Sequence, residues 1–162
     1  MSISTYVNLS LSFVVKDNRF DARKFKNTCF CPNFFFQVWH CAFEPFGGVP
    51  EENSVFASCG GNSVCIIDAR DASVKTKHYS NSYDENFHSL AWSSLPTLQG
   101  KINILAVAGS RSVLHLLHPD KAVCFGEFDL QKSDSRRKPK NPIESMIFHP
   151  KQPNILFGKI SS

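Results

Sequence analysis

Apolar residues occur along this chain in short runs of four to nine residues that are rich in Val, Ile, Phe and Trp. Turn-forming pairs bound these runs, among them Gly60-Gly61, Gly109-Ser110 and His118-Pro119. No stretch longer than a turn or two shows the period of about 3.6 residues that marks an amphipathic helix. The pattern therefore predicts strands at 37–44, 54–59, 63–68, 74–79, 87–92, 102–108, 112–118, 122–130, 143–148 and 154–160.

The predicted strands fall into copies of one unit. Phe43 and Trp92 lie 49 residues apart in matching phrases, and Gly60 and Gly109 have the same separation. Phe148 follows Trp92 by 56 residues and begins a third, looser copy. A period of this length indicates a repeat architecture. We expect the three aromatic residues to pack between neighbouring sheets.

Four short strands in each copy are typical of a propeller blade. The predicted fold is therefore all-β, a WD-repeat β-propeller fragment of about two and a half four-stranded blades. The first blade spans 37–80, the second 84–130, and the first half of a truncated third 143–162. A closed propeller needs roughly four to eight blades, which is why a fragment is expected. Residues 1–36 form an N-terminal extension, and 131–142 a basic loop.

Composition narrows the class of protein only coarsely. The chain has 162 residues, of which 42% are apolar and 20% charged, with a net charge of +4, as in a globular domain. No apolar run approaches the roughly 18 residues that span a bilayer, and the first residues do not resemble a signal peptide. Several of the six cysteines lie in apolar runs, which favours a reducing compartment.

Reactive residue types are present, but their spacing is uninformative. Cys29, Cys31, His40 and Cys41 contain zinc-ligand types without the usual paired spacing, so unpaired thiols are the favoured alternative. No thiol or carboxylate lies at a spacing that makes His115, His118 or His149 a base or a ligand. The glycine pairs at 47–48 and 60–61 and the phrase "AGSR" at 108–111 fit hairpin turns with positive φ better than a phosphate loop. We predict no enzyme activity, no metal, no cofactor and no small-molecule substrate.

Three phrases, "CAFEP", "CGGNSVCIID" and "ILAVAGSRSVLHLLHP", resemble the WD-repeat domain of the leucine-rich repeat and WD repeat-containing protein 1 family, a partner of the origin recognition complex. The phrases "DENF…AW", "LAVAGSR" and "FHPKQPNIL" also resemble the Polycomb WD-repeat family of embryonic ectoderm development. The resemblance covers about residues 37–158 and implies a non-catalytic nuclear scaffold on chromatin that binds methylated histone H3 and H4 tails. A Polycomb-type methyltransferase subunit, and a plain interaction scaffold in the nucleus or cytoplasm, are the alternatives.

Internal alignment puts Trp39, His88 and Glu144 at one position of the three copies, four residues before Phe43, Trp92 and Phe148. In the Polycomb relatives the matching residues of the first two blades wall a trimethyl-lysine site, so the resemblance implies a methyl-lysine cage at the channel mouth. Ring faces attract a quaternary ammonium. Trp39 suits this role, His88 is a weaker wall, and Glu144 adds negative charge at the rim. Packing in the core is the alternative for the ring residues.

The stretch "QKSDSRRKPKNP" carries five basic side chains, those of Lys132, Arg136, Arg137, Lys138 and Lys140. Such a loop fits contact with nucleic acid or nucleosomes. The alternative is a solvated loop with no ligand.

Overall fold

The computed structural model describes residues 38–45, 54–130 and 141–161. In these residues ten strands form three antiparallel sheets and no helix occurs, so none there is long and apolar enough to cross a membrane. The first sheet contains β1 (His40–Phe43), β2 (Val55–Gly60), β3 (Ser63–Asp68) and β4 (Ser73–Tyr79). The second contains β5 (Phe87–Thr97), β6 (Gly100–Gly109), β7 (Val113–His118) and β8 (Val123–Asp129). The third is the hairpin of β9 (Ile143–Phe148) and β10 (Leu156–Ile160).

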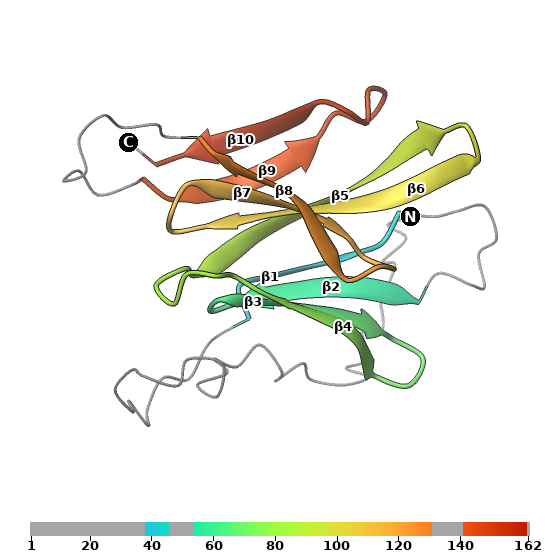
Figure 1. The fold of residues 1–162 in the computed structure, drawn as a ribbon, viewed down its shortest axis with the longest axis horizontal. Helices are drawn as coiled ribbons and strands as arrows, with labels where there is room; N and C mark the ends of the chain where they lie inside the picture. The colour runs from blue at the N-terminus through green and yellow to red at the C-terminus, as the bar shows by residue number, and fades with distance from the viewer. Residues whose placement is uncertain (1–37, 46–53, 131–140, 162) are drawn as a thin grey trace, which may run out of the picture.

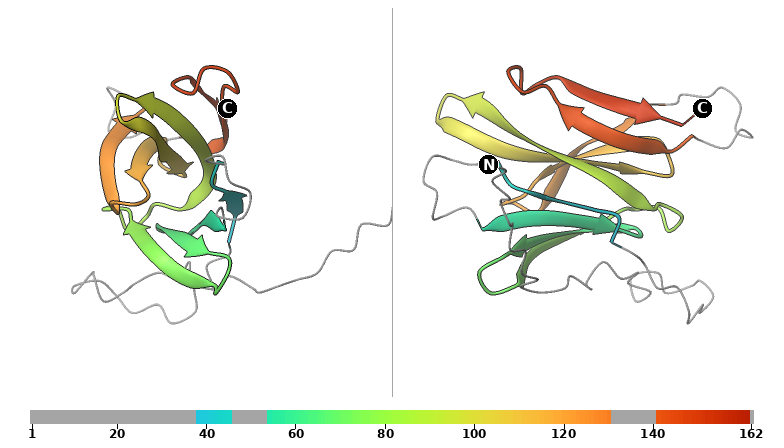
Figure 2. Two further views of the ribbon diagram at one scale, coloured as in Figure 1. Left: turned by 90° about the vertical axis from the view of Figure 1, so that its right-hand side faces the viewer. Right: turned by 180° about the vertical axis from the view of Figure 1, so that it is seen from behind.

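Each sheet keeps the order of the chain, β1-β2-β3-β4 and β5-β6-β7-β8, with β9 paired to β10. The three sheets are stacked in the same order (Figures 1 and 2). The first strands lie next to one another, because β5 packs against both β1 and β9. The prediction of an all-β, propeller-type array of two four-stranded blades and half of a third is confirmed.

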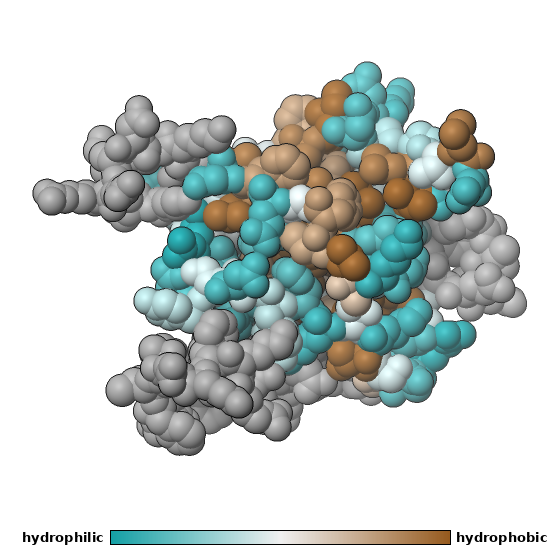
Figure 3. Space-filling view, in the orientation of Figure 1, coloured by the Kyte–Doolittle hydropathy of each residue, from teal (hydrophilic) through white to brown (hydrophobic). Residues whose placement is uncertain are grey.

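The apolar core lies between the sheets. The inner face of the first sheet packs on the second through Val55, Ala57, Cys59, Val64, Ile66, Phe87, Leu90, Leu105, Val107 and Leu117. A second cluster joins the second sheet to the third through Ala91, Ala106, Ala108, Ile143 and Met146. Blades therefore bury apolar area mainly against their neighbours, as repeat architectures do. On the face seen in Figure 3, apolar side chains gather over the middle of the molecule.

The three aromatic residues of the repeat differ in their surroundings. Trp92 packs against the first core cluster, and its Nε1–H donates a hydrogen bond of 2.9 Å to the carbonyl oxygen of Ala42. Phe148 packs against the second cluster. The packing prediction is wrong for Phe43, which is 66% exposed. Among the described residues its ring contacts that of its pairing neighbour Phe56, with centroids 5.6 Å apart. Phe43 lies on β1, the edge strand of its sheet, and faces away from the second sheet.

The turns explain which glycines are needed. Gly61 connects β2 and β3 with a φ of 54°, in the left-handed region that favours glycine. At the corresponding turn of the second sheet Ser112 takes the positive φ, 57°, rather than Gly109. The expectation of positive φ is therefore confirmed for Gly61 and wrong for Gly109. Gly109 is required because another part of the backbone approaches it closely. A Cβ atom at Gly109 would lie 2.0 Å from the carbonyl oxygen of Asn86.

Candidate functional site

The structure places Trp39, His88 and Glu144 at the start of the three adjacent first strands. Trp39 directly precedes β1, and its N–H donates a hydrogen bond of 2.9 Å to the carbonyl oxygen of Cys59. His88 and Glu144 are the second residues of β5 and β9. Because β5 contacts both β1 and β9, the three positions lie along one edge of the array.

Two of these residues lie in irregularities of the ladder. In the β5–β6 pair the register passes from Phe87 to Ser89 and leaves His88 without a partner residue. Glu144 lies opposite a similar register shift of the β9–β10 pair. A bulge bends the strand and redirects the side chain next to it. The local irregularity therefore recurs at matching positions of the second and third copies.

Two aromatic rings meet at this edge. The Trp39 side chain is 55% exposed, and its ring meets that of His88 at a centroid distance of 6.3 Å and an angle of 74°. Edge-to-face contact is a favourable arrangement for two rings. The two ring planes are close to perpendicular, so a ligand placed between them could contact both rings. Trp39 is thus outside the apolar core, contrary to the packing alternative.

His88 is also connected to the third sheet. Burial lowers the pKa of His88, while a backbone hydrogen bond with Ile143 and the Glu144 carboxylate oppose that shift. The ring is therefore neutral at neutral pH. This removes the repulsion that an imidazolium would exert on a cationic ligand.

Glu144 already has a cationic partner. Its carboxylate forms an ion pair with Lys159 of β10 and accepts a hydrogen bond from the Ser161 hydroxyl. Both contacts, Lys159 first, hold the pKa of Glu144 below its usual value, so the group is ionised at neutral pH. Much of its negative charge is compensated by Lys159, which weakens the rim charge expected from the sequence.

The other residues singled out in the sequence, those of the basic loop and of the zinc alternative, lie partly outside the described residues. Lys132, Arg136, Arg137, Lys138 and Lys140 lie outside the described residues, as do Cys29 and Cys31. Of the four residues considered as zinc ligands, the structure describes His40 and Cys41. The Nδ1 atom of His40 accepts a hydrogen bond of 3.2 Å from the N–H of Leu90, so His40 links the first two sheets. Cys41 is exposed.

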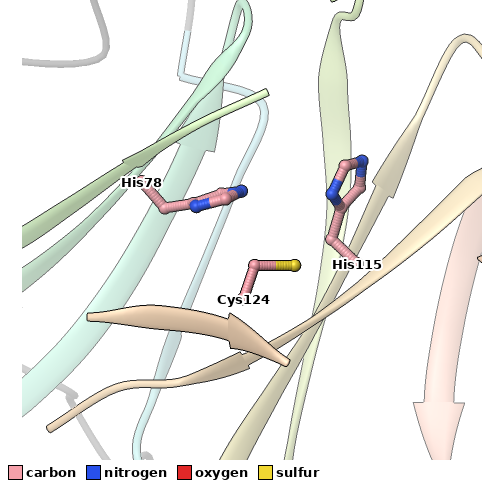
Figure 4. A group of neighbouring side chains, drawn as sticks. All are labelled: His78, His115 and Cys124. Atoms are coloured by element: carbon pink, nitrogen blue, oxygen red, sulfur yellow. The ribbon is translucent and has the colours of Figure 1, made fainter. Parts of the chain in front are cut away.

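One group of side chains was missed by the sequence analysis. His78 of β4, His115 of β7 and Cys124 of β8 converge between the first two sheets (Figure 4), with one nitrogen or sulfur atom of each within 4.8 Å of the others. Burial lowers the pKa of His115 to about 4 and raises the pKa of the Cys124 thiol. At neutral pH both groups are therefore neutral. His115 and Cys124 are nine residues apart and His78 lies in another copy, so no sequence motif connects them.

A family model agrees with the repeat and the fold. The WD domain of leucine-rich repeat and WD repeat-containing protein 1 matches residues 21–159. The chain belongs to this family. The family match confirms the resemblance drawn from the sequence phrases.

Curated relatives carry the name leucine-rich repeat and WD repeat-containing protein 1. The Xenopus tropicalis protein is 36% identical over 132 residues, which are 78% of this chain and 18% of that protein. The human protein is 32% identical over 126 residues, 75% of this chain and 18% of that protein. The chain thus spans less than a fifth of the length of these relatives.

Solved structures with the same fold come from Polycomb complexes. A chain in a humanized mutant of the Chaetomium thermophilum Polycomb Repressive Complex 2 has a TM-score of 0.60 and 15% identity, covering 77% of this chain and 26% of that one. A chain in the structure of ctPRC2 in complex with H3K27me3 and H3K27M has a TM-score of 0.57 and 15% identity, covering 76% and 25%. At this identity the likeness shows that this member of the family shares their fold, and no more.

Proposed function

We propose that this chain is part of a non-catalytic WD-repeat scaffold of nuclear chromatin that binds methylated histone H3 or H4 tails and associates with the origin recognition complex. The observation that carries the proposal is the contact between the exposed ring of Trp39 and the neutral ring of His88. The association with the origin recognition complex rests on the family resemblance alone.

The ligand class follows from the chemistry of the edge. A trimethylated lysine cannot donate a hydrogen bond, and it is attracted to ring faces by about 0.5–2 kcal/mol for each ring. Trp39 offers the stronger face and His88 the weaker, while the ionised Glu144 lies beside His88. A chain of similar fold belongs to a complex solved with H3K27me3, which supports testing this mark among others.

Contact with nucleic acid or nucleosomes through Lys132, Arg136, Arg137, Lys138 and Lys140 is the second part of the proposal. It rests on five cations within nine residues, 132–140, opposed only by Asp134. Such a contact would be independent of sequence and sensitive to salt. It would strengthen the hold of the scaffold on chromatin without specifying a histone mark.

The test is a pair of titrations of the 162-residue chain with trimethylated and unmethylated peptides of the same histone sequence. Trp39→Ala should weaken the trimethylated peptide by about five- to thirty-fold, equivalent to about 1–2 kcal/mol. The unmethylated peptide should change little. Phe43→Ala is the matched control, because Phe43 is also an exposed aromatic residue of β1 but its ring contacts Phe56 and not His88. Equal losses for both peptides would leave the plain scaffold.

A further inference from the structure

His78, His115 and Cys124 come from two different sheets and meet where those sheets pack together. The ring centroids of His78 and His115 lie 5.8 Å apart, and one potential ligand atom of each of the three side chains lies within 4.8 Å of the others (Figure 4). These three residues, here called the His–His–Cys cluster, belong to β4, β7 and β8, whereas Trp39 and His88 lie at the start of β1 and β5.

The strand registers explain the convergence. Residues paired across antiparallel strands project from the same face of a sheet. His78 pairs with Val64, and Cys124 pairs with Leu117. Val64 and Leu117 both belong to the core cluster between the first two sheets. His78 and Cys124 therefore project toward each other across this interface.

A bulge adds a fourth polar group. In the β7–β8 pair, Leu117 lies opposite Cys124 but Leu116 lies opposite Gly126, so Phe125 is an extra residue in β8. The extra residue reverses the alternation of side chains beyond it. As a result Glu127 faces the same side as Cys124, although the two are three residues apart. The Glu127 Oε1 atom lies 3.6 Å from Nδ1 of His115 and 4.0 Å from Sγ of Cys124.

His115 is the most telling member of the cluster. Its side chain is 3% exposed, and within the described part of the chain neither ring nitrogen has a hydrogen-bond partner. The His115 ring packs edge-to-face against the ring of Phe87, with centroids 5.1 Å apart, and this contact restricts the orientation of the imidazole. Buried polar atoms are almost always bonded to a partner. An imidazole held rigidly, with its nitrogens buried and unbonded, suits a metal ligand.

We propose that His78, His115 and Cys124 bind a zinc ion between the first two blades, with the Glu127 carboxylate as the fourth ligand. Zinc takes imidazole nitrogen, thiolate sulfur and carboxylate oxygen in tetrahedral sites with bonds of about 2.0–2.3 Å. Ligand atoms in such a site lie about 3.3–3.8 Å apart. The ligand atoms of His78, His115 and Cys124, which lie within 4.8 Å of one another, would need to approach by about 1 Å through side-chain rotation to reach that spacing.

Zinc binding would replace the proton of the Cys124 thiol, which is released to solvent, and leave both imidazoles neutral. The mixed set of one sulfur and two nitrogens favours zinc over calcium or magnesium, which take oxygen ligands. The ion would cross-link β4 of the first sheet to β7 and β8 of the second. Its role would be to fasten two blades together, independently of any histone ligand.

The proposal is tested on the 162-residue chain after removal of metals with a chelator, by titration with Zn²⁺ alone and with Co²⁺ as a spectroscopic probe. We expect one zinc ion per chain, a higher melting temperature with zinc, and the charge-transfer and visible bands of tetrahedral Co²⁺ bound to a thiolate. Cys124→Ser should abolish the charge-transfer band and weaken zinc by at least about 100-fold, since even partners outside the ligand set cost 10- to 100-fold. Glu127→Gln should weaken zinc and keep the band.

Two controls separate this site from other thiols. Cys41→Ser, and a double change of Cys29 and Cys31 to Ser, should leave the stoichiometry and the cobalt bands unchanged. The unmodified chain provides an independent readout that does not depend on the folding of a variant: zinc should protect Cys124 from alkylation, measured by mass spectrometry. Absence of zinc binding, bands that persist in Cys124→Ser, or bands lost in the double variant would each overturn the proposal.

Discussion

The ring of Trp39 lies edge-on to the ring of His88, with centroids 6.3 Å apart, although the two residues are 49 positions apart in the sequence. The separation of 49 positions in the sequence equals one period of the repeat, so the contact joins equivalent positions of neighbouring blades. A repeat that places a ring at this position in successive copies builds an aromatic edge from residues that are distant in the chain. The affinity of that edge for a cationic ligand then depends on which ring each copy supplies.

We predict that His88→Tyr tightens binding of a trimethylated histone peptide by up to about fivefold, equivalent to about 1 kcal/mol. A phenol ring is a better wall for a quaternary ammonium than a neutral imidazole. The measurement is calorimetric titration with methylated and unmethylated peptides. The unmethylated peptide is the control and should bind equally to both chains. Weaker binding of the methylated peptide, with the melting temperature unchanged, would show that His88 does not wall the ligand.

Lys159 should reduce the affinity of this edge for any cationic peptide, because its ammonium pairs with Glu144. Lys159→Met should release the carboxylate and tighten methylated and unmethylated peptides alike by about two- to fivefold, as expected for an exposed ion pair. The gain should shrink at high salt. Lys151→Met is the matched control, since Lys151 is an exposed lysine in the turn that connects β9 and β10. The same gain in both variants would mean a general effect of net charge.

The basic loop is predicted to act differently, through phosphate groups. Each phosphate contact lowers the logarithm of affinity by about 0.9 for each tenfold rise in salt, so changing Lys132, Arg136, Arg137, Lys138 and Lys140 to Gln should reduce the slope for DNA by up to about 4–5. A chain with Lys75, Lys77, Lys101, Lys121 and Lys151 changed to Gln has the same net charge and is the control. If the two variants show the same slope, the loop is solvated and does not contact DNA.

The strands were predictable because their apolar residues and turn signals are local. The exceptions are instructive. β5 extends to Thr97 and β6 begins at Gly100, beyond the predicted 87–92 and 102–108, although Ser93, Ser94 and Pro96 lack the apolar pattern. These residues are strands because they pair with each other across the hairpin. Pairing between segments, rather than composition, sets the ends of such strands.

The candidate sites show the same limit. The shared position of Trp39 and His88 could be read from the period, because equivalent residues of a repeat occupy equivalent places. The His–His–Cys cluster could not. Its formation depends on the bulge near Phe125 and on which faces of two sheets meet. Neither is written in the spacing of His78, His115 and Cys124. The exposure of Phe43 was missed for a related reason. Phe43 shares a face of the first sheet with its partner Phe56, opposite to the face that packs on the second sheet, and no other described sheet covers that face.

Gly109 is predicted to be intolerant of even a methyl group. In Gly109→Ala the new Cβ would meet the Asn86 carbonyl oxygen at 2.0 Å and the Glu85 Oε1 atom at 2.7 Å. Because one of these is backbone, the strand must move, and we expect a loss of about 3 kcal/mol in the free energy of unfolding. Gly158→Ala is the control, because its nearest neighbours would lie at 3.8 Å. Urea unfolding of both variants should show a large loss only for Gly109→Ala, and similar stabilities would contradict the clash.

Glu85 should make the stability of the chain depend on pH in the direction opposite to most carboxylates. Its side chain is buried, Oε1 accepts hydrogen bonds from the N–H of Asn86 and the Ser110 hydroxyl, and Oε2 has no hydrogen-bond partner among the described residues. Burial raises the pKa of Glu85, against the opposing effect of its hydrogen bonds and of Arg111. The folded chain therefore holds this proton more tightly than the unfolded chain, whose glutamate has a pKa of about 4.3. The contribution to stability is full below that pH and is lost as pH rises through the raised pKa of the folded state.

Glu85→Gln keeps the acceptor at Oε1 and removes the charge, so the variant should gain stability relative to the unchanged chain as pH rises from 4 to 7. The difference between the two unfolding curves isolates this group from Asp84, whose pKa is lowered and whose effect has the opposite sign. A difference that is constant across this range would show that Glu85 titrates alike in both states.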